Sequence, residues 1–139
     1  MRAICFRGQQ IEGKWVYGSL AHVDGNAYIV SPRSKFREKF GMEVPDCVVV
    51  CPETVGEFTG LVDCNGKQIF EGDYCCVTRP AVLAYGIITF QNGCFWFIDN
   101  AVYEGKQSWL RLCDLDVNRF RIEVRGNIHD NPSLAGRRE

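Results

Sequence analysis

Long hydrophobic runs are missing from this sequence. A membrane-spanning helix needs about 18 or more consecutive apolar residues, and no such stretch occurs in the chain. The first residues also lack the basic and then hydrophobic pattern of a secretory signal peptide. We therefore expect a cytoplasmic protein that does not enter a membrane.

An excess of positive charge is missing as well. The chain carries 16 basic and 17 acidic residues, which gives a formal net charge of -1. Proteins that bind nucleic acid usually carry a basic patch or stripe. The overall charge therefore favours neither nucleic acid nor an anionic membrane surface as a partner.

The common ligand-binding motifs are also absent. Neither GxGxxG nor GxxxxGK[ST] occurs, so a phosphate-binding loop has no support. No C-x-x-C pair occurs, and His22 and His129 are the only histidines. Cys47 and Cys51 would lie roughly 13 Å apart along a strand, too far to share one ion. We expect no metal and no cofactor.

Cysteine, in contrast, is abundant, with eight in 139 residues. A secreted chain of this kind would suggest a disulfide framework, but no secretory signal is seen. Free cysteine behaves as a small hydrophobe and is often buried. We therefore predict reduced core thiols at the six cysteines that lie inside apolar runs, which are Cys5, Cys47, Cys51, Cys75, Cys94 and Cys113.

Turn signals are the strongest feature that is present. Asp24-Gly25, Asn65-Gly66 and Asn92-Gly93 each separate two β-rich runs. These dipeptides tolerate the positive φ angles that tight hairpins require. The sequence therefore predicts three β-hairpins.

The remaining runs predict an all-β fold made of short hairpins. We expect a β-rich N-terminal subdomain over residues 1–54 and a small SH3-like barrel with a short tail over 55–139, its strands lying between 55 and 128, since closure hides the edges of short strands. The Glu71-Gly72-Asp73 turn before Tyr74 is similar to the start of a core strand in such barrels. The predicted strands are 1–6, 14–22, 27–30, 47–51, 74–78, 85–90, 94–98, 109–113 and 120–124.

Two segments need separate comment. Residues 31–45 suit one or two turns of amphipathic helix or a solvated loop, because Phe36 and Phe40 lie four apart among charged residues. Residues 47–51 form a short β-branched run between Pro45 and Pro52. This run predicts a buried strand that stops at Pro52.

One stretch of charge follows a pattern. Period-two alternation places Phe120, Ile122 and Val124 toward the core. The opposite face then carries three arginines and one glutamate: Arg119, Arg121, Glu123 and Arg125. The arginines could contact phosphates, with Trp96 or Trp109 as stacking surfaces. A solvated face is the favoured interpretation, because Glu123 interrupts the stripe.

Catalytic groups are weakly supported. His129 could serve as a base for a cysteine thiol, but its neighbours Asn127, Asp130 and Asn131 are typical of a turn. The carboxylates of Glu57, Asp63, Glu71 and Asp73 are likewise interpreted as turn and surface groups. We therefore expect no enzyme and assign no catalytic residue.

Four sequence blocks carry a family resemblance: MRAICFRG at 1–8, KWVYGSL at 14–20, TVGEFTGLVDCNGKQIFEGDY at 54–74 and RGNIHDNPSL at 125–134. They resemble the YopX family of bacteriophage and prophage proteins. The resemblance implies a bacterial host cell and framework roles for Gly60, Gly66 and Gly72, but it implies no reaction. Residues 22–51 depart most from the pattern, so partner specificity is expected there.

Three functions follow from these observations. The leading hypothesis is a non-enzymatic phage accessory protein that binds an unknown host or phage protein, with self-association into a homo-oligomer left open. The first alternative is a nucleic-acid-binding barrel that uses Arg119, Arg121 and Arg125, joined by Arg33, Lys35 and Arg37. The second is a small thiol-dependent hydrolase built on a cysteine and His129.

Overall fold

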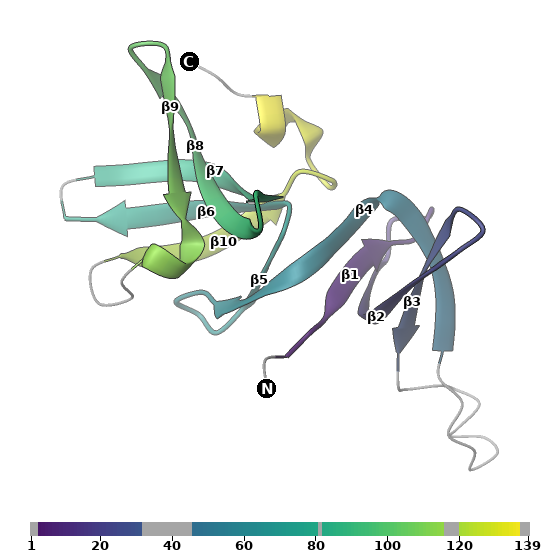
Figure 1. The fold of residues 1–139 in the computed structure, drawn as a ribbon. Coiled ribbons are helices and arrows are strands. Elements are labelled where there is room, and N and C mark those ends of the chain that lie inside the picture. Colours follow the sequence, from purple (N-terminus) through teal and green to yellow (C-terminus); the bar gives the residue numbers. More distant parts are fainter. Residues whose placement is uncertain (1–2, 32–45, 81, 116–119, 137–139) are drawn as a thin grey trace. The chain divides into compact units, whose positions relative to one another are not determined.

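The computed structural model describes residues 3–31, 46–80, 82–115 and 120–136. Within them the chain is built from antiparallel strands and two short 3-10 helices, so the predicted all-β class is confirmed (Figure 1). The chain divides into two compact units, Met1–Phe58 and Thr59–Glu139. The sequence places this boundary after residue 54.

The first unit holds three strands and most of a fourth, β4, and their pairings form a closed ring. β1 pairs with β2, β2 with β3, β3 with β4, and β4 again with β1. A small core of Ala27, Ile29 and Val50 lies among them. A Cβ on Gly8 would lie 2.7 Å from the Val50 side chain. Glycine at position 8 therefore permits β1 to approach β4 this closely. The strands are β1 Phe6–Gln9, β2 Trp15–Val23, β3 Asn26–Ser31 and β4 Asp46–Val62.

The first strand differs from its prediction. The sequence predicts a strand over residues 1–6, but β1 begins at Phe6 and continues to Gln9. The charge on Arg7 argues against a buried strand position, yet Arg7 is only 5 % exposed. Its guanidinium lies over the Trp15 ring, 4.7 Å from the ring centroid. A cation can be buried here because it packs on an aromatic face.

The strand beginning at Asp46 also differs, because it does not stop at Pro52. β4 continues to Val62, and its register with β1 shifts between the Gln9–Cys51 pair and the Arg7–Gly56 pair. In this irregular stretch Thr54 Oγ1 accepts a hydrogen bond from the Gln9 amide (2.9 Å) and donates one to the Cys51 carbonyl (2.6 Å). A residue in a bulge is not paired in the hydrogen-bond ladder, so Pro52 does not need an N–H there. The strand can therefore continue past Pro52.

The second unit contains a five-stranded antiparallel sheet in the order β10-β6-β7-β8-β9. Its core is centred on Phe97 and includes Ile69, Val77, Ile88 and Leu112. The SH3-like barrel predicted over 55–128 is not confirmed by this arrangement. The elements are β5 Gln68–Phe70, which pairs with the end of β4, β6 Asp73–Arg79, β7 Val82–Gln91, β8 Cys94–Tyr103, β9 Lys106–Arg111, β10 Arg121–Asn127, and the 3-10 helices η1 Leu112–Asp114 and η2 Pro132–Gly136.

The predicted hairpins are present. Asn65-Gly66 joins β4 to β5, Asn92-Gly93 joins β7 to β8, and Asp24-Gly25 joins β2 to β3. The Asn65-Gly66 turn is held by Asp63, which is 6 % exposed. Asp63 Oδ1 accepts hydrogen bonds from the amides of Asn65 (2.9 Å) and Lys67 (2.8 Å). Its Oδ2 accepts one from the Val124 amide of β10 (3.0 Å), so one carboxylate joins the turn to the sheet.

The predicted burial of the thiols is largely wrong. Cys75 is buried, but Cys47 and Cys113 are exposed, although both lie in apolar runs. Val49, from the same run as Cys47, is 55 % exposed, which also contradicts the buried strand expected at 47–51. An antiparallel strand buries only one of its faces here, so an uninterrupted apolar run does not imply burial on both. The segment 31–45, for which the sequence suits either a short helix or a loop, lies outside the described residues beyond Ser31.

Candidate functional site

The structure describes only part of the predicted arginine stripe. Arg119 lies outside the described residues, as do Arg33, Lys35 and Arg37. Arg121 and Arg125 are exposed on β10, while Ile122 and Val124 pack against the core, as alternation predicts. The structure therefore brings together two of the three residues named for nucleic-acid binding.

Arg121 and Arg125 both have side-chain partners. Arg125 forms an ion pair with Glu123 through Nε and Oε1. A hydrogen bond that the Arg121 guanidinium donates to the Cys64 side chain raises the pKa of Arg121. Neutralised and engaged cations bind phosphate less readily than free ones. This pairing weakens the phosphate-binding hypothesis.

The tryptophans named as stacking surfaces lie on strands that do not pair with β10, which carries Arg121 and Arg125. Trp96 of β8 and Trp109 of β9 pack edge to face, with centroids 5.9 Å apart. Strand β9 is at the opposite end of the strand order from β10. The strand order therefore does not place these rings beside the two described arginines.

A hollow of about 450 Å³ lies between β7 and β8 on the second unit. Its walls carry apolar side chains that are open to solvent: Val82 is 51 %, Leu83 56 %, Tyr85 36 % and Tyr103 82 % exposed. The remaining lining residues are Tyr74, Ala84, Asp99, Asn100 and Ala101. Sequence reasoning missed this site. The signal for it was the unbroken run Val82-Leu83-Ala84-Tyr85, which has no polar residue for a solvent face.

The hollow exists because β8 leaves β7. Residues 86–91 of β7 pair with residues 94–99 of β8. Strand β7 begins earlier, at Val82, so the described register with β8 does not include its first four residues. Beyond Ile98 the pairing of β8 with β9 is irregular and resumes at Val102. Figure 1 shows the paired ends of β8 and β9 turning away from the direction of β7. We call the space between the diverging ends of β7 and β8 the fork.

Three local features are found where β7 and β8 diverge. A Cβ on Gly86 would lie 2.2 Å from the Ile98 carbonyl oxygen, so glycine permits the close approach at its base. Asp99 Oδ1 accepts a hydrogen bond from the Ala101 amide (2.8 Å), which bends β8 locally. Asn100 Nδ2 donates to the Leu134 carbonyl of η2 (3.2 Å), which ties the β8 side to the C-terminal helix.

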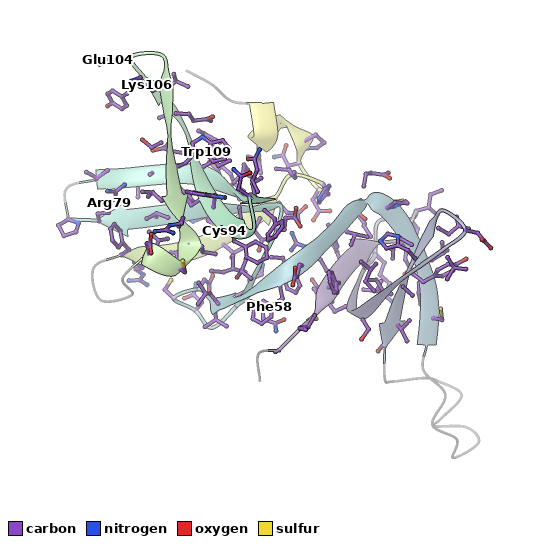
Figure 2. The ribbon with its side chains drawn as sticks, in the orientation of Figure 1. Phe58, Arg79, Cys94, Glu104, Lys106 and Trp109 are labelled. Carbon is purple, nitrogen blue, oxygen red and sulfur yellow. The ribbon has the colours of Figure 1, made fainter. Side chains whose placement is uncertain are left out.

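Aromatic rings form the β6 and β7 side of the hollow. The rings of Tyr74 and Tyr85 stack with centroids 6.0 Å apart and planes inclined by 11°. Beyond them, Figure 2 shows Glu104 and Lys106 at the far tip of the β8–β9 hairpin, next to Tyr103 in the chain. Asp99 is the one charged residue among the described residues that line the hollow. The site is therefore apolar and aromatic, with a single negative charge.

The candidate catalytic residue lies elsewhere in the second unit. Asn127 Oδ1 accepts hydrogen bonds from the amides of His129 (3.0 Å) and Asp130 (2.8 Å). This is the turn that the sequence suggested for the segment. Within the described part of the chain, no group of three or more His, Cys, Asp or Glu side chains is arranged to hold a metal ion. The eight cysteines all lie in the described residues and form no disulfide bond, and Cys64, in addition to Cys47 and Cys113, is exposed.

Among the described residues, no helix is both long enough and apolar enough to span a membrane. Fold and surface together define an all-β protein of two antiparallel sheets with an aromatic surface hollow. The family model described as YopX protein matches residues 5–135. The chain therefore belongs to the YopX family, as the sequence blocks suggested. No curated protein matches the chain.

Proposed function

We propose that the chain is a non-enzymatic protein-interaction module of a phage or prophage, acting in the cytoplasm of the bacterial host. The observation that carries the proposal is the hollow of about 450 Å³ with four exposed apolar side chains on its walls. Exposed apolar residues are common when scattered, but a contiguous patch around a concavity marks a binding surface.

The residue types support a protein as the partner. Tyrosine is enriched at protein interfaces, since its ring buries a large area at little entropic cost and its hydroxyl stays hydrated. Tyr74, Tyr85 and Tyr103 all line the hollow. Lysine and arginine are absent from the described lining, which argues against a polyanion at this place.

The test is affinity capture from phage-infected cells with full-length wild-type chain and two variants. Leu83→Ser with Tyr103→Ser removes two exposed lining side chains, which contribute little to folding because they are 56 % and 82 % exposed. Val62→Ser is the matched control, since Val62 is 53 % exposed, lies in the same unit and does not line the hollow. We expect a partner retained by wild type and control and lost by the double variant. Equal capture by all three chains would reject the proposal.

Nucleic-acid binding is the competing function, and it is supported by the exposure of Arg121 and Arg125 on one strand. Capture from the same cells with and without nuclease separates the two functions. Nuclease-sensitive capture that is insensitive to the Leu83 and Tyr103 substitutions would favour the arginine face and contradict the hollow.

A further inference from the structure

The open edge of β7 inside the fork is the most informative feature of the second unit. Val82, Leu83, Ala84 and Tyr85 pair on one side with Arg79, Thr78, Val77 and Cys76 of β6. On their other side, the described register with β8 begins only at Gly86. In an antiparallel strand alternate residues direct both N–H and C=O to the same neighbour. Every second residue of this segment therefore directs its peptide groups into the fork.

We propose that the fork binds an extended segment of the protein partner by β-strand addition along Val82–Tyr85. This deepens the proposed function by naming how the partner is bound, and it rests on that function. An exposed strand edge offers main-chain hydrogen bonds that give affinity, while pockets for alternate side chains give specificity. The fork supplies both, because the same four residues that present the edge also line the hollow.

The other edges of this sheet are less suitable. On β10, Asp63 Oδ2 already accepts the Val124 amide, and the Ile122 carbonyl accepts the Cys64 amide (2.9 Å). Strand β9 ends in Arg111, which is engaged by Asp114 (2.8 Å). Strand β9 is also outside the lining of the 450 Å³ hollow, so a segment added there would gain main-chain bonds without apolar burial. Within the described part of this sheet, edge and hollow coincide at the fork.

Charge and length define the chemistry of the bound segment. Asp99 is the single charged residue of the described lining, so a lysine or arginine on the bound segment is complementary to it. Four residues of β7 span roughly 13 Å, which sets a pairing length of about four residues in the partner. The occupant is therefore a short extended peptide segment with alternating apolar residues and one basic residue. A proline at an edge-facing position is excluded, because proline has no N–H to donate.

A displayed library of random twelve-residue peptides, selected on immobilised full-length chain, supplies the probe. The strongest enriched peptide is synthesised, and its Kd is measured by calorimetry. Each of its amides is then N-methylated in turn. We expect methylation to weaken binding about ten-fold or more at alternate residues and to be tolerated at the residues between them, because only every second N–H faces β7.

Two further readouts fix the place and the charge. Amide hydrogen exchange should slow within Val82–Tyr85 when the peptide is bound, since edge amides become hydrogen-bonded. Asp99→Asn keeps an Oδ1 acceptor for the Ala101 amide but removes the charge. This variant should bind the peptide several-fold more weakly at low salt, with a smaller difference at high salt.

The possible failures can be told apart. A peptide that loses binding to the Leu83→Ser and Tyr103→Ser chain but tolerates N-methylation at every position would leave the proposed function intact and overturn strand addition. If no peptide is enriched more on the wild-type chain than on the Leu83→Ser and Tyr103→Ser chain, strand addition is overturned as well. The capture experiment from phage-infected cells tests the proposed function independently of this result. A concentration-dependent dimer that the same double variant abolishes would make a second copy of the chain the occupant and would overturn the partner segment.

Discussion

Asp63 should stabilise the second unit, because its buried carboxylate accepts hydrogen bonds from three backbone amides. Asp63→Asn keeps an oxygen for the amides of Asn65 and Lys67 but turns an NH₂ group toward the Val124 amide, so two donors face each other. Leaving a buried N–H without an acceptor costs about 1 to 3 kcal/mol. With Asp63 6 % exposed, we expect a loss of about 2 kcal/mol in the free energy of unfolding.

The assay is urea unfolding followed by tryptophan fluorescence in a Trp15→Phe background, in which emission comes only from Trp96 and Trp109 of the second unit. A unit of this size has an m-value of about 1 kcal/mol/M, so the midpoint should fall by about 2 M. Asp114→Asn is the control, because Asp114 forms an exposed ion pair with Arg111, with side chains 59 % and 52 % exposed. Such pairs contribute about 0 to 1 kcal/mol.

The pH dependence gives a second check on the same carboxylate. Burial raises the pKa of Asp63, but hydrogen bonds from the Val124, Lys67 and Asn65 amides and the charge of Lys67 outweigh it, so the pKa is lowered. Because its pKa is lower in the folded state, the carboxylate stabilises the folded state. This contribution is complete above the pKa of the unfolded state, near 4, and is lost as the pH falls through the pKa of the folded state. The difference between wild type and Asp63→Asn should therefore shrink below about pH 4. A difference that stays constant down to pH 2, or equal midpoints for the two proteins at pH 7, would refute the reasoning.

Three other outcomes are expected. Gly86→Ala should lose about 2 kcal/mol or more, since its Cβ would meet the Ile98 carbonyl at 2.2 Å and overpacking against backbone is costly; unchanged thermal unfolding would contradict this. In native protein a thiol-reactive chromogenic reagent should modify Cys47, Cys64 and Cys113 first, and all eight thiols should titrate after anaerobic denaturation without zinc in elemental analysis; early reaction of Cys75 would contradict the assigned burial. Single- and double-stranded oligonucleotides should not be retained at low salt, because Glu123 neutralises Arg125; salt-sensitive binding that is abolished by replacing Arg119, Arg121 and Arg125 with alanine would contradict this expectation.

The local features of the fold could be predicted from the sequence. Asn92 has a φ of 53° and Gly93 of 78°, and both values are encoded by the dipeptide itself. The alternation on β10 likewise placed Ile122 and Val124 against the core. Turn chemistry and period-two alternation involve only neighbours in the chain, so they can be read without knowing the tertiary structure.

The remaining features depend on residues distant in sequence. Strand β4 passes Pro52 because Thr54 bonds both Gln9 and Cys51, and the contact with Gln9 spans 45 residues. The buried position of Arg7 depends on the Trp15 ring from the next strand.

The hollow could not be predicted for the same reason. It depends on the point at which β8 leaves β7, and the features found there, the close approach of Gly86 to Ile98 and the link from Asn100 to Leu134, join residues distant in sequence. The apolar run Val82–Tyr85 predicts an exposed apolar surface but not that this surface lines a hollow.

The affinity of the captured partner tests the central claim most directly. Titration of the purified partner into wild-type chain, the Leu83→Ser and Tyr103→Ser chain, and the Val62→Ser control compares surfaces of similar exposure in the same unit. The account predicts equal Kd values for wild type and control and a Kd about ten-fold or more higher for the double variant, as expected for the loss of central apolar contacts. The same Kd for all three chains would contradict the assignment of the hollow as the binding site.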